Sequence, residues 1–243
     1  MRIPRIYTPQ PLSVGTHLAL EADAAHHLAR VLRMGVDAPL TLFNGDGCEY
    51  VARIAAIDKK NVSVAIERSD SFERESPLSI QLGIAVSKGE RMDWVIQKAT
   101  ELGVAQISPL QSERVEVRLH GEREQKKRAH WQAITVAACE QCQRNRLPGI
   151  DVTQSLSQWL DSVIADEKFV LHHRSDTTLT HATPAPRRVA LLIGPEGGLS
   201  EGEIALAERA GFKSLRLGPR VLRTETAPVA AISVLQFLWG DLK

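Results

Sequence analysis

The sequence lacks long hydrophobic runs and has few cysteines, and each absence excludes a class of protein. No apolar stretch approaches the roughly 18 residues of a membrane-spanning helix, and the opening MRIPRIYTPQ is too polar for the core of a signal peptide. The three cysteines show no disulfide-framework spacing, which is typical of a reducing compartment. We therefore expect a cytoplasmic protein without a membrane partner.

Metal-binding motifs are also missing. Cys139 and Cys142 form a C-x-x-C pair, but a zinc site needs four ligands and Cys48 lies far away in the sequence. The pair comes late in an expected helix, whereas redox thiols lie at a helix N-terminus, so packing is the favoured role. His172 and His173 have no second cluster at ligand spacing. We expect no metal site.

Charge and aromatic content restrict how the chain would bind nucleic acid. The net charge is only +1, so affinity for phosphates has to come from local basic clusters. Aromatic residues make up 5% of the chain, which limits base stacking to one or two positions.

The pattern of expected elements changes near residue 75. Before it, the strand candidates are THLALE, PLTLFNG, EYVARIAAI and NVSVAIE. One helix interrupts them in EADAAHHLARVLRMG, with Asp23 as the expected cap and Gly35 as the expected stop. This pattern predicts a small β-barrel over residues 1–74, followed by a polar linker, RSDSFERESP.

From residue 78, strands alternate with helices, which predicts a largely parallel α/β sheet in a second domain, residues 75–243. The expected strands are SIQLGIAVS, AQISPL, KFVLHH, RVALLIG and SLRLGP, and the expected helices are GERMDWVIQKATELG, 122–144, 200–210 and 227–239. The last helix, APVAAISVLQFLW, is apolar nearly all round. A sheet face would cover one side of it and a partner subunit the other, so we expect a homodimer.

A glycine-rich loop, GPEGGLSEGE, follows the apolar strand RVALLI and leads directly into a helix. It matches neither the P-loop nor the dinucleotide fingerprint. Glu196, Glu201 and Glu203 would repel a phosphate, so the loop suits a nucleoside-like ligand with some positive character, such as S-adenosylmethionine. The alternative is a tight turn before a helix that the capping box of Ser200 and Glu203 begins.

A second strand exit, KSLRLGPRVLRTETA, repeats this design with Gly218 and Pro219. The two exits would lie side by side at the carboxyl edge of one sheet, which would bring Arg220, Arg223 and Glu225 to a site that already contains Glu196. A solvated charge run is the alternative for these residues.

These segments resemble a known family. LLIGPEGG followed by LGPRVLRTETA resembles the paired cofactor loops of the SPOUT methyltransferases, and EQCQRNRLP with MRIPRIY narrows the likeness. The whole chain resembles the bacterial ribosomal RNA small subunit methyltransferase E family, which transfers a methyl group from S-adenosylmethionine to N3 of a uridine in 16S ribosomal RNA. The resemblance implies an α/β SPOUT-type domain with a trefoil knot and a mostly parallel sheet, preceded by a PUA-like β-barrel that binds RNA. It also implies a homodimer.

The resemblance places the cofactor between three loops, where backbone groups do most of the binding. The implied cofactor-binding residues are Leu171, Ile193, Gly194, Glu196, Gly198, Leu217, Gly218, Leu222 and Thr224. The residues that we expect to bind RNA are Arg2, Arg5, Arg30, Arg33, Arg144, Asn145 and Arg146. For the basic run 123–128 a solvated face is favoured.

For catalysis, we predict that Arg223 acts on the substrate or on the charge of the transition state. Glu225 or Glu196 would serve as the general base if desolvation raised its pKa. Two alternatives stay open: a SPOUT methyltransferase that acts on another RNA, such as transfer RNA, and a relative that binds RNA without catalysis.

Overall fold

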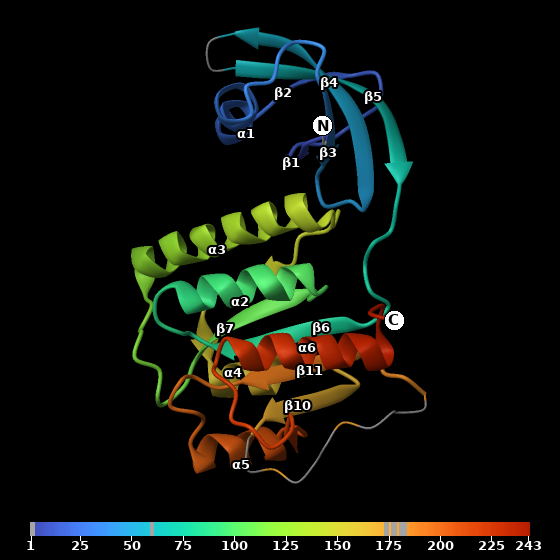
Figure 1. Cartoon of the computed structure of the whole chain (residues 1–243). Coiled ribbons are helices and arrows are strands. Elements are labelled where there is room, and N and C mark those ends of the chain that lie inside the picture. Colours follow the sequence, from blue (N-terminus) through green and yellow to red (C-terminus); the bar gives the residue numbers. More distant parts are fainter. Residues whose placement is uncertain (1–2, 59–60, 173–174, 176–178, 180–183) are drawn as a thin grey trace. The chain divides into compact units, whose positions relative to one another are not determined.

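The computed structural model describes residues 3–58, 61–172, 175, 179 and 184–243 (Figure 1). The chain divides into two compact units, of which the first comprises Met1–Glu75 and Cys139–Leu147 and the second Ser76–Ala138 and Pro148–Lys243. The boundary after Glu75 lies at the expected linker. Local sequence patterns do not predict that residues 139–147 belong to the first unit, because residues 139–142 form the end of a long helix that begins in the second.

The first unit is built on a five-stranded sheet in the order β1-β3-β4-β5-β2. Its strands are β1 Arg5–Tyr7, β2 His17–Ala19, β3 Pro39–Phe43, β4 Cys48–Asp58 and β5 Asn61–Ser71. Neighbouring strands are antiparallel except β1, which runs parallel to β3. Alternate residues of β5, Val62, Val64 and Ile66, are buried, as expected for a strand with one face on the core.

The helix of the first unit begins and ends differently from the prediction. It consists of α1 (Ala22–His26) and a π-helical turn, η1 (His27–Val31), and Glu21 rather than Asp23 is its N-cap residue. The Glu21 carboxylate makes no cap hydrogen bond because it accepts hydrogen bonds from Thr8 and Gln10 instead. Arg33, with φ 52°, takes the left-handed conformation expected at Gly35.

The second unit contains the predicted parallel sheet, in the order β12-β10-β11-β6-β7-β8 with β9 beside β7. Its strands are β6 Ser79–Ala85, β7 Gln106–Gln111, β8 Gly149–Ile150, β9 Gln154–Ser155, β10 Glu167–Leu171, β11 Arg188–Ile193 and β12 Lys213–Leu215. All their pairings are parallel. β11 is buried from Val189 to Ile193 because helices cover both faces of the sheet.

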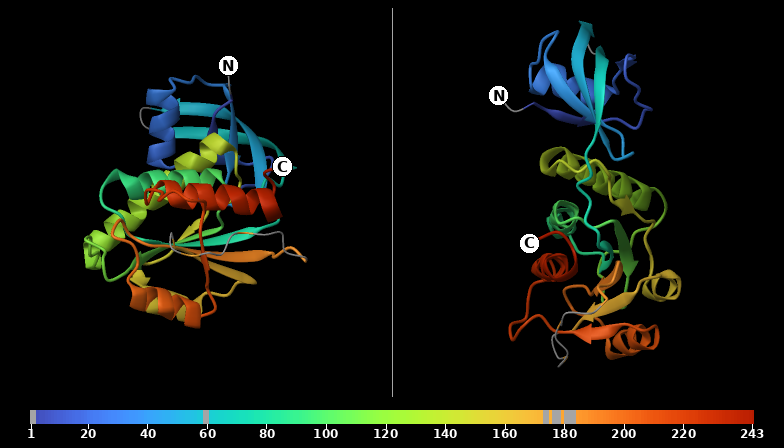
Figure 2. Two further views of the ribbon diagram at one scale, coloured as in Figure 1. Left: turned by 60° about the horizontal axis from the view of Figure 1, so that its bottom comes forward. Right: turned by 90° about the vertical axis from the view of Figure 1, so that its right-hand side faces the viewer.

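Helices α2 (Glu90–Glu101) and α6 (Thr226–Trp239) lie together on one face of this sheet, and α4 (Leu156–Ser162) and α5 (Glu201–Arg209) lie on the other (Figure 2). The remaining helix is α3 (Gly121–Cys142). Sequence reasoning missed α4, although Ser155 and Gln158 form a capping box there. The Trp159 ring of α4 packs so closely on Gly83 that a Cβ at this glycine would lie only 2.5 Å from a carbon of the ring.

Helix α6 is largely apolar, as predicted, and its one fully buried polar side chain is held by the rest of the unit. Gln236 donates a hydrogen bond to the Leu102 carbonyl (2.9 Å) and accepts one from the Ser76 hydroxyl (2.6 Å). Phe237 is 61% exposed and Val234 38% exposed. The sheet and its neighbours therefore leave part of this apolar helix uncovered. The trefoil knot of the second unit stays a prediction.

Candidate functional site

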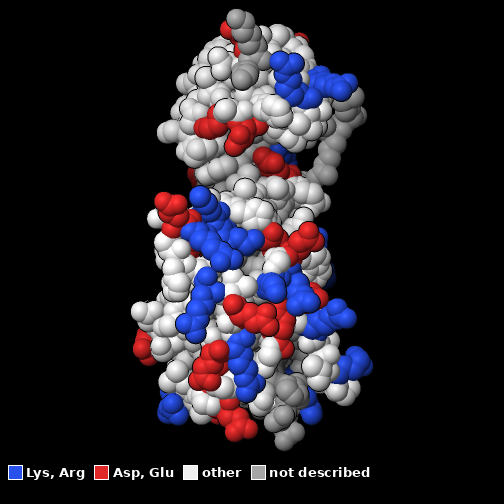
Figure 3. Space-filling view, turned by 90° about the vertical axis from the view of Figure 1, so that its left-hand side faces the viewer, with Lys and Arg blue, Asp and Glu red and all other residues white. Residues whose placement is uncertain are grey.

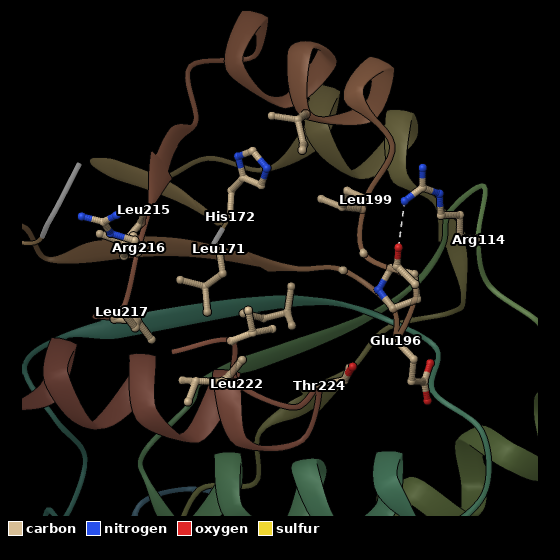
Figure 4. Close-up of a pocket in the computed structure, with 18 of the residues that line it drawn as sticks. Arg114, Leu171, His172, Glu196, Leu199, Leu215, Arg216, Leu217, Leu222 and Thr224 are labelled. Carbon is tan, nitrogen blue, oxygen red and sulfur yellow. Dashed lines mark hydrogen bonds between the residues drawn. The ribbon is translucent and has the colours of Figure 1, made fainter. Parts of the chain in front are cut away.

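A cavity of about 450 Å³ opens where β10, β11 and β12 of the second unit end (Figure 4). Ligands of open α/β sheets bind at the carboxyl ends of the strands, and the volume lies in the range of about 300–1,000 Å³ that small-molecule sites occupy. The apolar part of its wall consists of Leu171, Ile193, Leu199, Ile204, Leu215, Leu217, Val221, Leu222 and Ala227. The cavity thus suits a ligand with a substantial apolar surface.

The glycine loop after β11 forms one wall through its backbone. The Gly198 amide donates a hydrogen bond to the Pro195 carbonyl at 2.8 Å and closes a turn in which Gly198 has φ +68°. A Cβ at Gly194 would lie 2.9 Å from Leu199 Cγ and 3.0 Å from the Leu199 amide nitrogen. Both glycines are therefore required, one by its conformation and the other by its closeness to Leu199.

Helix α5 starts at this loop with the predicted capping box, which changes the electrostatics expected from the sequence. The Glu203 amide donates to the Ser200 hydroxyl, and the Ser200 amide donates to the Glu203 carboxylate. That carboxylate also accepts a hydrogen bond from the Glu113 amide at 2.8 Å, and Glu203 is buried. Glu203 therefore does not line the cavity, whereas Glu196 and Glu201 do.

Two arginines from distant parts of the second unit hold the glycine loop. Arg114, which follows β7, donates to the Gly197 carbonyl at 2.8 Å (Figure 4), and Arg91 of α2 forms an ion pair with Glu196 at 3.0 Å. Sequence reasoning missed both, because nothing in their local pattern shows that they meet a loop 83 and 105 residues further along the chain. The Glu196 carboxylate is thus partly neutralised by a neighbour.

The second predicted exit also reaches the cavity, although the two exits are not adjacent. β10 lies between β11 and β12, so the cavity spans three strand ends rather than two. Of the predicted cofactor-binding residues, those that line it are Leu171, Ile193, Gly194, Glu196, Gly198, Leu217, Leu222 and Thr224. Gly218 lies in the same loop with φ +73° but does not line the cavity. His172 and Arg216 also line it and were not among the predicted cofactor-binding residues.

The predicted catalytic residues lie next to the cavity rather than in its wall. Arg223 is exposed and stands between Leu222 and Thr224, which both line the cavity. Its carbonyl accepts hydrogen bonds from the amides of Thr226 and Ala227 and so begins α6. Glu225 is the N-cap residue of α6 without a side-chain cap hydrogen bond. The roles of Arg223 and Glu225 stay predictions.

The residues predicted to bind RNA fall into two groups in the first unit. Arg30, Arg33 and Arg146 are exposed, and Arg146 lies 3.8 Å from Glu73 in an exposed ion pair. Arg5, Arg144 and Asn145 bind other residues of the same unit, and Arg2 lies outside the described residues.

The second group, Arg5, Arg144 and Asn145, makes buried polar contacts within the first unit. Arg5 donates to Asn145 at 2.6 Å and forms an ion pair with Glu49 at 2.8 Å. The Asn145 amide donates to the carbonyls of Gly47 and Phe72. Arg144, whose side chain is 6% exposed, forms an ion pair with Glu75; burial alone would lower its pKa, but the hydrogen bond and charge of Glu75 raise it. In the described chain these groups anchor residues 144–145 to the sheet instead of facing solvent.

Neither a metal cluster nor a membrane helix occurs in the described part of the chain. No group of three or more His, Cys, Asp or Glu residues there is arranged to hold a metal ion. No described helix is both long enough and apolar enough to span a bilayer. A hydrogen bond with Cys142 and burial raise the pKa of the Cys139 thiol, which fits the predicted packing role. His173 lies outside the described residues.

Comparison with known proteins gives matches over both units. Residues 74–236 match an RNA methyltransferase domain, and residues 20–67 match an RNA methyltransferase PUA domain. Proteins named ribosomal RNA small subunit methyltransferase E are 38% identical over 242 residues in Buchnera aphidicola subsp. Schizaphis graminum and 30% identical over 240 residues in Bacillus subtilis. These alignments cover 99% and 95% of this chain and 98% and 93% of the relatives.

Two solved structures are similar over their whole length. A putative methyltransferase from Legionella pneumophila in complex with the cofactor SAM is 46% identical, with a TM-score of 0.96. A ribosomal RNA small subunit methyltransferase E from Neisseria gonorrhoeae bound to S-adenosyl methionine is 38% identical, with a TM-score of 0.92. Each alignment covers 100% of both chains. The matches confirm the predicted fold, a PUA-like domain followed by a SPOUT-type methyltransferase domain.

Proposed function

Because the chain belongs to the ribosomal RNA small subunit methyltransferase E family, we propose that it methylates RNA of the small ribosomal subunit with S-adenosylmethionine as the methyl donor. The observation that carries this proposal is the cavity at three strand ends in a fold whose solved relatives, 46% and 38% identical, bind that cofactor. The expected site of action is the cytoplasm.

The residues around the cavity fit S-adenosylmethionine. Its leucine and isoleucine walls suit an adenine ring. No atom lies within 4 Å of the place where a Cβ at Gly198 would be, so a ligand can approach the backbone closely there, while the missing Cβ at Gly194 lets Leu199 pack against the loop. Glu196 and Glu201 suit a ligand that carries positive charge. When bound, S-adenosylmethionine supplies an electrophilic methyl group on a sulfonium sulfur. The chain's own task is to hold the nucleotide in line with that methyl group and to exclude water.

The finer proposal is that the acceptor is N3 of a uridine, as the family resemblance implies. Uridine N3 carries a proton that has to leave as the nitrogen attacks, so the site needs a base and a group that stabilises the developing charge. Arg223 lies between two residues of the cavity wall, which supports it as the charge-stabilising group. Glu225 and Glu196 are the candidate bases, and Glu196 would first have to leave Arg91.

The proposed substrate also assigns a task to the first unit. Arg30 and Arg33 are exposed on its helix and just beyond it, where phosphates reach them. Replacing both with alanine should weaken binding of small-subunit RNA and lower the slope of log K against log salt by about one to two, because each lost phosphate contact removes close to one unit. Filter binding across a salt series measures both quantities. An unchanged slope would remove these arginines from the interface.

We further propose that the chain forms a homodimer through the face of α6. Phe237 and Val234 lie one turn apart on that helix, and both leave apolar surface exposed. Phe237→Glu should therefore produce a monomer at micromolar concentration, because a carboxylate would be desolvated at the interface. Light scattering measures the mass. Val152→Glu, at an exposed apolar residue between β8 and β9, is the matched control, and a monomeric unaltered protein would contradict the proposal.

Methyl transfer to defined RNA fractions tests the proposed function. Small subunits, large subunits and transfer RNA from a strain that lacks this protein are each incubated with the protein and methyl-labelled S-adenosylmethionine. We expect label in the small-subunit RNA only. Label in transfer RNA alone would support a different SPOUT methyltransferase, and cofactor binding without any transfer would support a relative that has lost catalysis.

A further inference from the structure

A second cavity of the second unit, about 460 Å³ in volume, lies at the start of α2 and shares no residue with the cofactor cavity. The loop that follows β6 forms one side of it, and the first turns of α3 with the segment before them form the other. Its lining consists of Val86, Ser87, Lys88, Gly89, Val117, Leu119, Arg123, Lys126 and Lys127. Four of these residues are basic and none is acidic, so the cavity suits an anion.

The backbone at this cavity favours the same charge. Helix α2 is 12 residues long, and its N-cap residue is Gly89, which offers no side chain to accept hydrogen bonds from the first-turn amides. The amides at the start of a helix lack intrahelical acceptors and carry the positive end of the helix dipole. An anion in the cavity would supply the missing acceptor, as phosphates do at other helix N-termini.

Ser87 gives independent support for a ligand. The residue is 3% exposed, and its hydroxyl oxygen has no hydrogen-bond partner in the described part of the chain, although it lines the cavity. Buried polar side chains are nearly always paired, because an unpaired hydroxyl loses the hydrogen bonds that water would have given it. An oxygen-rich anion at the start of α2 would accept a hydrogen bond from this hydroxyl.

Of the four basic side chains around the cavity, Lys127 alone has a close acidic partner among the described residues. Lys127 is paired with Asp93 at 3.1 Å, and although burial raises the pKa of Asp93, hydrogen bonds from His130 and Lys127 lower it below its usual value. Lys88 has a partner, Glu116, only at 4.0 Å, and both side chains are more than three-quarters exposed, so this pair contributes little.

Lys126 is similarly exposed beside Glu122, at 3.8 Å. Arg123 forms no ion pair with any described residue within 4.0 Å. Figure 3 shows the face at which α2 and α3 begin, and basic side chains gather on the second unit there with acidic ones between them. Lys88, Arg123 and Lys126 therefore remain available to an anion.

This cavity lies beside the methyl-transfer site. β6, whose loop carries Ser87, is the direct neighbour of β11, whose loop carries Gly194, and both loops leave the same edge of the sheet. Arg91 in the first turn of α2 forms its ion pair with Glu196 of the cofactor loop. A nucleotide that reaches the cofactor would thus place an adjoining backbone phosphate within reach of α2, away from the carboxylates of the glycine loop.

We propose that the cavity formed by Ser87, Lys88, the start of α2 and Arg123 binds a backbone phosphate of the RNA next to the methylated nucleotide. That the cavity binds an anion follows from its lining and from the start of α2. That the anion is an RNA phosphate rests on the proposed function. The phosphate would accept hydrogen bonds from the Ser87 hydroxyl and the α2 amides, with the basic side chains around it.

Titration of the full chain with inorganic phosphate, followed by amide NMR, tests the anion site. We expect saturable shifts of the amides of residues 87–91, and roughly tenfold weaker binding in Ser87→Ala and in Lys88→Ala with Arg123→Ala, as expected for lost charge-assisted hydrogen bonds. Arg209→Ala, which removes an exposed charge of the same unit outside both cavities, should leave the titration unchanged. Absence of saturable shifts in the unaltered protein would overturn the site.

Binding of small-subunit RNA identifies the source of the phosphate. For Lys88→Ala with Arg123→Ala, we expect roughly tenfold weaker RNA binding and a salt slope lower by about one. Cofactor affinity should be unchanged, which also shows that the variant is folded. Phosphate binding with an unchanged RNA slope would overturn the assignment to RNA. If both arms succeed but no methyl group is transferred, the proposed function fails while the phosphate site stands.

Discussion

Replacing Gly194 with valine should weaken S-adenosylmethionine binding on the order of a hundredfold, while the protein remains folded. The new Cβ would lie 2.9 Å from Leu199 Cγ and 3.0 Å from the Leu199 amide nitrogen, so the loop has to shift. Overpacking of this kind costs about 1–3 kcal/mol, and a shifted loop also loses its backbone contacts to the ligand. Together, the two effects correspond to a loss of affinity on the order of a hundredfold. Titration calorimetry measures the affinity, and thermal unfolding reports on the fold.

Gly202→Val is the matched control, because it changes the same residue type eight positions later. A Cβ at Gly202 would meet only the Ser200 hydroxyl, at 3.7 Å, and Gly202 does not line the cavity. We expect nearly unchanged cofactor affinity in this variant. Tight binding by the Gly194 variant, or equal losses in the two, would contradict the account of the glycine loop.

Arg223→Ala should lower turnover by a factor on the order of 10² to 10³ and leave cofactor affinity within about twofold. The reason is that Arg223 is exposed beside the cavity and does not line it, so its contribution would arise with the charge that develops on the nucleotide. Single-turnover methyl transfer gives the rate, and calorimetry gives the cofactor affinity.

Arg223→Lys should restore part of this rate, because the charge returns without the planar guanidinium. Arg209→Ala, at an exposed residue outside both cavities, should keep the full rate. A normal rate in Arg223→Ala would remove Arg223 from catalysis. A large loss of cofactor affinity would instead make it a cofactor-binding residue.

Local patterns predicted the features of the fold that depend on neighbouring residues. RVALLI is a central strand because an unbroken apolar run needs cover on both faces, and Ser200 with Glu203 forms the expected capping box. Predictions failed where a side chain forms hydrogen bonds with residues outside its own helix or strand. Glu21 binds Thr8 and Gln10, so its carboxylate is not free to cap α1, and sequence spacing does not show that competition.

The part of the candidate site that depends on strand ends was predictable, and the part that depends on distant contacts was not. The glycines and leucines of the cofactor cavity follow strand ends, and strand ends of a parallel sheet meet at one edge. Arg91 and Arg114, which hold the glycine loop, could not be predicted because they come from other strand exits. Distant contacts also decide the surroundings of Arg144 and Asn145. Their basic and polar side chains suggested RNA contacts, but in the structure both residues are buried, and Arg144 forms an ion pair with Glu75.

The most direct test of the proposed function is to identify the methylated atom. Small subunits from a strain that lacks this protein are incubated with it and with methyl-labelled S-adenosylmethionine, and the 16S ribosomal RNA is digested to nucleosides for mass spectrometry. We expect one labelled nucleoside, uridine methylated at N3. Label on carbon 5, on a ribose oxygen, or only in transfer RNA treated in parallel would contradict it.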